Sequence, residues 1–163
     1  MIQGHGGNIY ELARELGCAP TDIVDLSSNV NPLGPPEGLI DCLSGKMSVI
    51  TALPEVDAAG IRQAFAHRHH IDADRVVGGN GTTQLIYALP QALASQKALV
   101  LVPAYADYAD ACALHGVPCD TVTATPDNHF CFSKEAVLSA IAAAKADLVF
   151  ICNPNNQIGR AHV

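Results

Sequence analysis

The sequence predicts an α/β protein in which helices cover both faces of a mainly parallel sheet, giving three layers. Apolar runs of strand length alternate with helix-length segments through residues 82–152, and this alternation is typical of βαβ units. The runs are almost continuous in apolar residues, as expected for strands buried on both faces. A chain of 163 residues, 49% hydrophobic and 15% charged, also suffices for one core of ordinary domain size.

The first expected element is a helix over 9–16, because Asn8 is a favourable N-cap and Gly17 a favourable stop. Asp57 is a plausible cap for a later helix with apolar residues at helical spacing. The expected helices cover 9–16, 37–45, 57–70, 82–94, 105–116 and 133–146. The expected strands cover 22–26, 75–79, 98–103, 119–124 and 147–152.

Charge and cysteine usage narrow the class of protein. The net charge of -7 argues against nucleic acid or an anionic membrane surface as the main partner. Six cysteines without a C-x-x-C pair fit reduced thiols in a cytoplasmic protein. The His67, His69 and His70 cluster lies at a helix end, where it complements the helix dipole, so we expect no metal site.

A glycine-rich turn between a strand and a helix is the first candidate site. In VVGGNGTTQLIYAL, the glycines allow close backbone approach to a ligand. The free N–H groups of the helix that opens at Thr82 favour an anion, and the Thr82 and Thr83 hydroxyls add donors. A phosphate is the expected ligand, although a plain βα turn has the same pattern because the spacing matches neither G-x-G-x-x-G nor a P-loop.

Two further candidates come after the next strands. Tyr105 comes after an apolar run, where its ring can stack on a planar cofactor or simply pack in the core. The asparagines of CNPNN come after the last run and can bind a ring hydroxyl or form an ordinary turn. His5 stands between glycines in an arm before the first helix, and this arm is either a mobile terminus or a cover for a site.

Five motifs in a fixed order carry a family resemblance. HGGN, DLSSNVNPLGPP, GGNGTTQLIYAL, PAYADY and FICNPNN resemble the N-terminal half of fold-type I pyridoxal-phosphate enzymes of the aminotransferase class I and II family, up to about Asn156. The opening motifs are most similar to threonine-phosphate decarboxylases of cobalamin biosynthesis, and next to histidinol-phosphate aminotransferases. The resemblance implies an N-terminal arm and substrate-pocket segment over 1–35 and an incomplete cofactor-binding large domain over 36–157.

The resemblance also implies roles for individual residues. The phosphate of pyridoxal 5'-phosphate is held by the positions that match Gly81, Thr82 and Thr83. Tyr105 matches the aromatic residue that stacks on the pyridine ring, and Asn156 the asparagine that donates to the phenolic oxygen. The substrate pocket of the decarboxylases is lined by the positions that match His5, Gly6 and Asn29.

The implied reaction joins an amino acid to the cofactor as a Schiff base, and the cofactor ring takes up the electrons left when a bond at Cα breaks. In the decarboxylases the bond that breaks joins Cα to the carboxylate, and in the aminotransferases it joins Cα to hydrogen. The resemblance therefore implies a small phosphorylated amino acid as substrate and a homodimeric parent enzyme, with neither nucleic acid nor membrane as a partner.

Departures from the family affect catalysis. Leu53-Pro54-Glu55 stands where the family has Tyr-Pro-Asp, whose tyrosine reaches the cofactor phosphate of a neighbouring subunit. The Schiff-base lysine belongs to the other half of the family fold, and the lysines present match no catalytic position. We therefore expect an inactive fragment without catalytic residues, prone to aggregate through an open sheet edge. Residues 158–163 lack a family counterpart and are interpreted as a non-native tail, encoded by a sequencing adapter.

Two interpretations from other functional classes stay open. The chain can be a half-protein that binds a phosphate compound without catalysis. It can also be a subunit that a second chain completes. The first of these interpretations keeps the phosphate site at Thr82 and Thr83. An open reading frame that continues beyond the Asn156 codon in the genomic DNA would favour the enzyme fragment over both.

Overall fold

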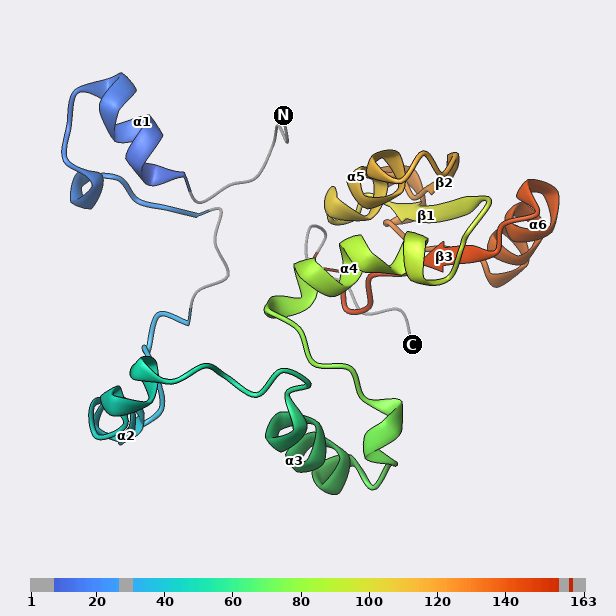
Figure 1. Ribbon diagram of the computed structural model, residues 1–163. Helices are drawn as coiled ribbons and strands as arrows, with labels where there is room; N and C mark the ends of the chain where they lie inside the picture. Colours follow the sequence, from blue (N-terminus) through green and yellow to red (C-terminus); the bar gives the residue numbers. More distant parts are fainter. Residues whose placement is uncertain (1–7, 27–30, 156–158, 160–163) are drawn as a thin grey trace. The chain divides into compact units, whose positions relative to one another are not determined.

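The computed structural model describes residues 8–26, 31–155 and 159, and the chain divides into two compact units, Met1–Gly78 and Gly79–Val163 (Figure 1). In the part of the first unit that the structure describes, all regular elements are helical. The second unit contains a parallel sheet with its helices. Among the described residues, no helix combines the length and the apolar character needed to span a membrane.

The first unit has three α-helices and three short 3₁₀ helices in its described part. The predicted cap at Asn8 is confirmed, because its side chain accepts a hydrogen bond from the Glu11 backbone N–H. Gly17 ends the same helix in the left-handed conformation, with φ of 66°. The elements are α1 Ile9–Leu16, η1 Pro20–Asp22, α2 Leu39–Ser44, η2 Met47–Thr51, α3 Ala59–His69 and η3 Ala73–Arg75.

The strands predicted over 22–26 and 75–79 are wrong for the described residues. Ile23 and Val76 do have extended backbones, with φ/ψ of −97°/125° and −115°/129°. An extended segment becomes a strand only when a neighbour pairs with its N–H and C=O groups. The Val76 carbonyl instead accepts a hydrogen bond from the side chain of Arg62. The sequence pattern therefore specified the backbone conformation here but not the pairing.

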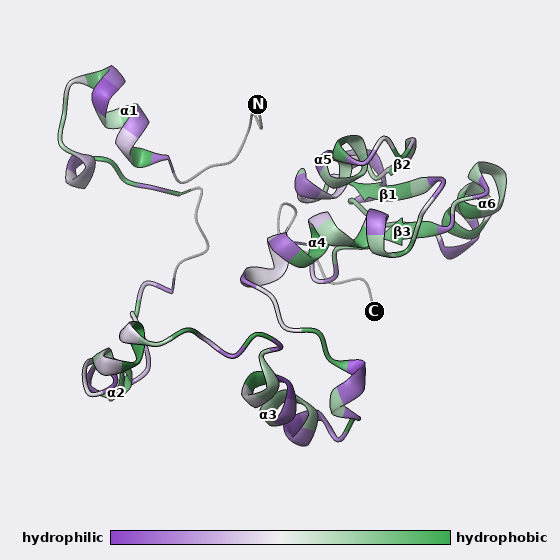
Figure 2. Ribbon diagram, viewed as in Figure 1, coloured by the Kyte–Doolittle hydropathy of each residue, from purple (hydrophilic) through white to green (hydrophobic). Residues whose placement is uncertain are grey.

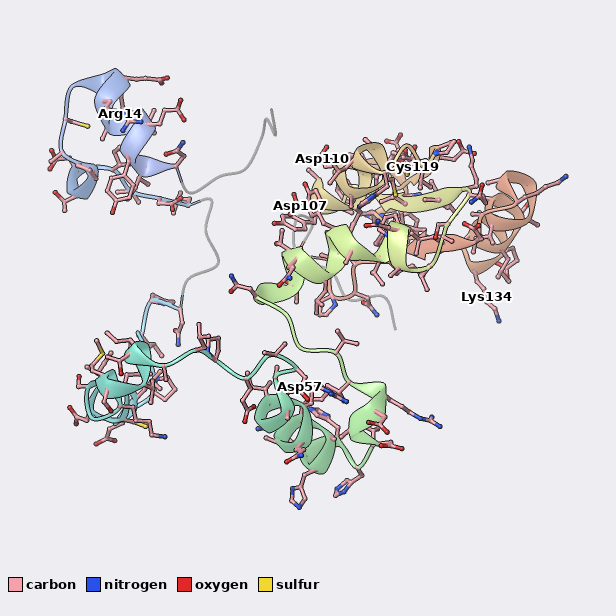
Figure 3. The ribbon with its side chains drawn as sticks, in the orientation of Figure 1. Arg14, Asp57, Asp107, Asp110, Cys119 and Lys134 are labelled. Carbon is pink, nitrogen blue, oxygen red and sulfur yellow. The ribbon has the colours of Figure 1, made fainter. Side chains whose placement is uncertain are left out.

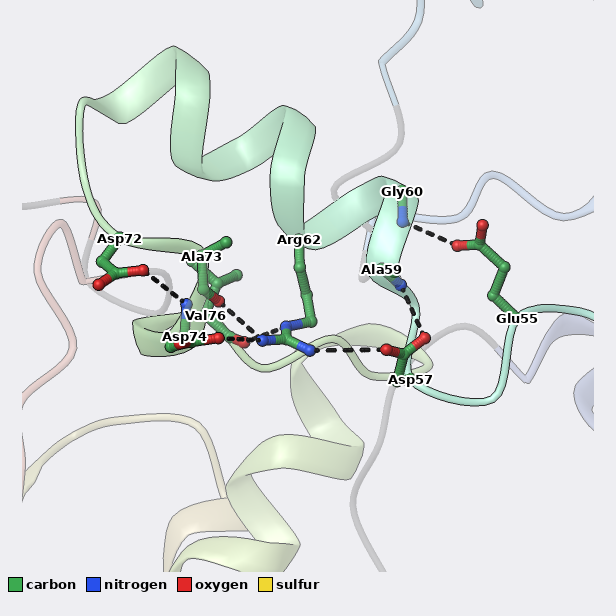
Figure 4. A network of polar contacts seen from close by, with 9 residues as sticks. All are labelled: Glu55, Asp57, Ala59, Gly60, Arg62, Asp72, Ala73, Asp74 and Val76. Atoms are coloured by element: carbon green, nitrogen blue, oxygen red, sulfur yellow. Dashed lines mark hydrogen bonds and ion pairs between the residues drawn. The ribbon is translucent and has the colours of Figure 1, made fainter.

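Arg62 on α3 connects the helix to the segment after it (Figure 4). Its Nε donates to the Val76 carbonyl at 2.9 Å, and its Nη2 donates to the Ala73 carbonyl at 3.0 Å. The same guanidinium forms ion pairs with Asp74 at 3.3 Å and Asp57 at 3.9 Å. One side chain thus satisfies two backbone carbonyls that lack a strand partner among the described residues.

Replacing Arg62 with methionine is expected to open this segment locally, with a loss of about 1–2 kcal/mol in the free energy of opening. Methionine keeps the aliphatic stem but removes both hydrogen bonds to the carbonyls. Amide hydrogen exchange of the peptides over 57–78 measures the effect. Arg68→Met is the matched control, since Arg68 lies on the same helix and is exposed. Equal exchange rates in the two variants would contradict the prediction.

The second unit confirms the predicted alternation of helices and parallel strands. Its strands pair in the order β2-β1-β3, with β1 parallel to both neighbours. The registers include Ala98 opposite Cys119 and Val100 opposite Phe150. The elements are α4 Gly81–Ala92, β1 Ala98–Val102, α5 Asp107–Leu114, β2 Cys119–Thr123, η4 Pro126–Asn128, α6 Lys134–Ala144 and β3 Leu148–Phe150.

The central strand β1 is buried on both faces, as its sequence predicts. Its first four residues are each at most 5% exposed, and the strand is hydrophobic along its length in Figure 2. On one face Ala98 and Val100 pack with Cys112 of α5 and Phe150 of β3. Leu99 and Leu101 point to the opposite face, because successive side chains of a strand alternate. The core of this unit is therefore centred on β1.

The strand order places a topological switch point beside β1. The chain leaves β1 toward β2 on one side and returns to β3 on the other. Connections of this kind are right-handed in nearly all proteins, which places α5 and α6 on opposite faces of the sheet. Ligands of such α/β sheets bind outside the carboxyl ends of the strands at this position. The loops after Val102 and Phe150 meet this condition.

Asp147 joins the amino ends of β1 and β3, at the edge of the sheet away from these loops. Its carboxylate accepts hydrogen bonds from the Gln96 N–H at 2.8 Å and the Lys97 N–H at 3.1 Å. The Asp147 N–H donates to the Lys97 carbonyl at 3.0 Å. The two bonds to the carboxylate lower the pKa of Asp147, because they favour its charged form.

Asp147→Asn is therefore expected to destabilise the chain near neutral pH and to have less effect in acid. A carboxyl group with a lowered folded-state pKa contributes stability above its unfolded pKa, about 3.9, and loses it as the pH falls through the folded value. Urea unfolding at about pH 6 and about pH 3 measures the difference between wild type and variant. The exposed Asp127 provides a control as Asp127→Asn. A difference that is independent of pH for Asp147→Asn would contradict the prediction.

Candidate functional site

The glycine-rich turn before α4 has two separate requirements for glycine. A Cβ on Gly79 would lie 2.8 Å from Cδ2 of Leu85, so the turn packs closely on its own helix. Gly81 has a φ of 80°, in the region where residues with a side chain are strained, and no heavy atom lies within 4 Å of its would-be Cβ. The backbone at Gly81 is thus both unusual and open to an approaching ligand.

The N-terminus of α4 keeps donors available for an anion. Asn80 occupies the N-cap position, but its side chain makes no cap hydrogen bond. Gln84 instead reaches back and accepts from the Asn80 N–H. The first N–H groups of a helix have no carbonyl partner within it, and the dipole makes this end positive. Together with the exposed hydroxyls of Thr82 and Thr83, this end of α4 meets the requirements for binding a phosphate group.

Two of the residues predicted from sequence meet at this end of the helix. Tyr105 lies in the loop after β1, and its hydroxyl is 3.4 Å from Oγ1 of Thr83. These residues are separated by 22 positions in the sequence. The fold therefore brings the aromatic residue after β1 to the N-terminal turn of α4.

A cavity of about 640 Å³ lies against these residues. This volume is within the range of about 300–1,000 Å³ that is typical of small-molecule pockets. One part of its wall is polar and aromatic, and the other is formed by apolar residues of α4. The lining residues are Thr82, Thr83, Leu85, Ile86, Leu89, Tyr105, Tyr108, Phe150 and Cys152.

Three aromatic rings form one wall of the cavity. Tyr105 and Tyr108 meet edge to face, with centroids 6.0 Å apart and planes at 87°. Tyr108 stacks on Phe150 at 4.9 Å and 18°. Burial and the neighbouring Cys152 raise the pKa of Tyr108 to about 12, so its phenol stays protonated at neutral pH. The wall is therefore uncharged and connects the loop after β1 to the end of β3.

Asn155 binds the loop that carries Tyr105, a contact that the sequence did not reveal. Its side chain is 2% exposed, and its Nδ2 donates to the Pro103 carbonyl at 2.6 Å. This bond connects the loop after β3 to the loop after β1. The signal in the sequence was the asparagine-rich CNPNN stretch, which indicated polar contacts at a strand end but not which asparagine makes them.

Four of the predicted site residues lie outside the described part of the chain. They are His5, Gly6, Asn29 and Asn156. Of the other predicted residues, Gly81, Thr82 and Thr83 lie in the first turn of α4, and Tyr105 lies beside them. The described residues thus bring together the four positions predicted to contact a phosphate or a ring.

Known proteins match this chain over most of its length. The family described as aminotransferase class I and II matches residues 21–162. Threonine-phosphate decarboxylase of Salmonella typhimurium is 32% identical over 155 residues, which are 95% of this chain and 42% of that protein. Histidinol-phosphate aminotransferase of Stutzerimonas stutzeri is also 32% identical over 155 residues, 94% of this chain and 41% of that protein.

The fold of the chain is also similar to that of a solved structure from the same group of enzymes. The crystal structure of L-threonine-O-3-phosphate decarboxylase from Porphyromonas gingivalis is similar with a TM-score of 0.70 at 28% identity. The match covers 86% of this chain and 40% of that structure. The chain thus spans about two fifths of the length of each of these three proteins.

Proposed function

The chain belongs to the aminotransferase class I and II family, and from this membership we propose that its cavity binds pyridoxal 5'-phosphate. The observation that carries the proposal is the position of Tyr105 beside Thr83, at the open N-terminus of α4. A phosphate group and an aromatic ring system are the two parts of this cofactor. The described site offers one feature for each of them.

The residues present fit this cofactor. Thr82 and Thr83, with the N–H groups of the first turn of α4, would hold the phosphate. The face of Tyr105 would stack on the pyridine ring. The apolar residues of α4 that line the cavity would exclude water from the ring. Asn156 is proposed to donate to the phenolic oxygen of the cofactor, as the family resemblance implies.

Pyridoxal phosphate, when bound, supplies an electron sink for breaking a bond at the Cα atom of an amino acid. The contribution of this chain is to bind and orient the cofactor and the substrate. We propose that the whole protein acts on a small phosphorylated amino acid, with decarboxylation of L-threonine O-3-phosphate as the first candidate reaction. His5, Gly6 and Asn29 are proposed to line the substrate pocket, and the whole protein is proposed to be a homodimer.

The lysine that anchors the cofactor is proposed to lie outside the described residues. No lysine is among the described residues that line the cavity. Lys97 directly precedes β1, whereas Tyr105 follows the other end of this strand, and the Lys97 Nζ pairs with Asp120 at 2.7 Å. Lys145 ends α6 in the left-handed conformation. In this proposal the described residues bind the cofactor without covalent attachment.

Titration of the chain with three ligands tests the cofactor site. The chain has no tryptophan, so quenching of tyrosine fluorescence reports binding near Tyr105 and Tyr108. We expect pyridoxal 5'-phosphate to bind at least about tenfold more tightly than pyridoxal, because charge-assisted hydrogen bonds to phosphate are strong. Inorganic phosphate should compete. Equal affinity for pyridoxal and its phosphate would contradict the proposal.

The reaction is tested on the whole protein. Release of carbon dioxide from L-threonine O-3-phosphate, dependent on added cofactor, would support the decarboxylase. Transfer of the amino group from histidinol phosphate to a 2-oxo acid, without release of carbon dioxide, would support the aminotransferase instead. The alternative of a phosphate-binding protein without catalysis predicts binding in the fluorescence titration and neither reaction.

A further inference from the structure

The strands separate unequally at the edge of the sheet where the cavity lies. Pairing of β1 with β2 continues to Val102, and the Val102 carbonyl then accepts a hydrogen bond from the Ala124 N–H at 2.8 Å. Pairing of β1 with β3 runs only to Val100 opposite Phe150. The chain after β3 therefore leaves β1 earlier than the chain after β2 does, and Phe150 and Cys152 line the cavity on this side.

Asn155 contacts the end of β1 again beyond this separation. Its Nδ2 donates to the Pro103 carbonyl at 2.6 Å, from a side chain that is 2% exposed. Pro103 directly follows the last residue of β1. The amide thus supplies on the β3 side what the Ala124 N–H supplies on the β2 side, which is a donor for a carbonyl at the end of β1. This bond joins two loops that border the cavity.

Pro103 begins the short loop between β1 and α5, and this loop carries Tyr105. The far end of the loop is fixed by α5, whose first residue, Asp107, is buried (Figure 3). The Tyr105 hydroxyl is 3.4 Å from Thr83 Oγ1, and its ring meets that of Tyr108 edge to face at 87°. The orientation of the ring depends on the path of this loop, and the bond from Asn155 fixes where that path begins.

The amide of asparagine suits this position chemically. A buried carbonyl that loses its donor costs free energy, and the Asn155 N–H group is a donor for the Pro103 carbonyl. An ionised aspartate has nearly the same shape but can only accept. Stacking on a planar ligand requires the Tyr105 ring to present one face to the cavity. An orientation that is fixed before binding reduces the entropy that binding would otherwise lose.

We propose that Asn155 is a positioning residue that acts through the Pro103 carbonyl and holds Tyr105 in the orientation that stacks on the cofactor. This inference rests on the proposed function for its ligand. The competing explanation is that Asn155 only satisfies a buried carbonyl, as buried polar groups commonly do, and contributes to stability alone. The positioning role predicts a displaced Tyr105 ring in a variant that is still folded, whereas the competing explanation does not.

The first test is an NMR measurement on the ligand-free chain with Asn155→Asp, which places an acceptor against the carbonyl. We expect the nuclear Overhauser effect between the Tyr105 ring and the Thr83 methyl group to be lost. The effect between the stacked rings of Tyr108 and Phe150 should stay, because their contact does not involve the loop. General loosening of the unit would weaken both effects together, and that result overturns the positioning role.

Asn128→Asp is the matched control for the first test. The Asn128 side chain accepts a hydrogen bond from the Thr125 N–H at 3.1 Å, and a carboxylate accepts it equally well. This variant should keep both ring contacts. Should Asn155→Asp not fold, Asn155→Ala removes the same donor without adding a charge, and the same two contacts are compared. An unchanged contact between Tyr105 and Thr83 on loss of the Asn155 donor overturns the positioning role.

The second test measures ligand affinity from the amide NMR signals of Thr82 and Thr83. It uses Asn155→Ala, because the charge of an aspartate would repel any anion. We expect pyridoxal 5'-phosphate to bind about fivefold more weakly, as for loss of one hydrogen bond. Inorganic phosphate should bind as in the wild type, because the donors of α4 are unchanged. When Tyr105→Leu has removed the ring, Asn155→Ala should cause much less further loss, since the two residues act together.

Failure of this proposal and failure of the proposed function give different results. A wild-type chain that does not bind pyridoxal 5'-phosphate overturns the proposed function, and the ring contacts of the ligand-free chain still decide whether Asn155 positions Tyr105. A wild-type chain that binds, with equal losses for Asn155→Ala in the presence and absence of Tyr105→Leu, retains the cofactor site. That second result overturns the positioning role of Asn155.

Discussion

Replacing Phe150 with alanine is expected to lower the free energy of unfolding of residues 79–163 by about 3–4 kcal/mol, the usual cost of deleting a buried phenyl ring. Phe150 ends β3 and is 6% exposed. Its ring packs in the core with Val100 and stacks on Tyr108 at 4.9 Å. The variant therefore loses transfer free energy, leaves a cavity and removes the support of the aromatic wall.

Urea unfolding followed by tyrosine fluorescence measures this loss, since Tyr87, Tyr105 and Tyr108 all lie in the second unit. Leu138→Ala on α6 is the control, because Leu138 is 55% exposed and its truncation should cost well below 1 kcal/mol. The same Phe150 variant should weaken ligand binding, since Tyr108 loses its stacking partner. A loss for Phe150→Ala as small as that of the control would contradict the burial of this ring.

The elements whose signals are local could be predicted from the sequence. The second unit has its strands and helices where the apolar runs and the helical spacing placed them, and the Asn8 cap and Gly17 stop lie at the predicted positions. Such features depend on a few adjacent residues. The parallel sheet is also predictable, because a helix between two strands leaves parallel pairing as the simple connection.

Pairing and burial depend on distant residues and could not be predicted in the same way. Val76 is extended, but its carbonyl binds Arg62 rather than another strand. Asp107 and Asn155 are both 2% exposed although their residue types are usually found at the surface. The sequence showed an acid and an asparagine after two strands, whereas only the fold shows that both are buried and that Asn155 binds the Pro103 carbonyl.

Replacing Gly81 with alanine is expected to weaken ligand binding, because of the backbone conformation at this position. Alanine at a φ of 80° is strained, at a cost of about 1–2 kcal/mol, even though its Cβ would meet no neighbour. To relieve this strain the backbone must rotate, and the N–H groups at the start of α4 rotate with it. A phosphate that depends on those donors should then bind about tenfold more weakly, equivalent to about 1.4 kcal/mol.

Gly116 provides a control with the same strain at a different place. Its φ is 67°, and its would-be Cβ also has no neighbour within 4 Å, but it lies after α5 and does not line the cavity. Gly116→Ala should therefore lose similar stability in urea and bind pyridoxal 5'-phosphate as the wild type does. Gly81→Ala should lose both stability and affinity. Equal affinities in the two variants would show that the start of α4 does not hold the phosphate, because strain alone is common to both.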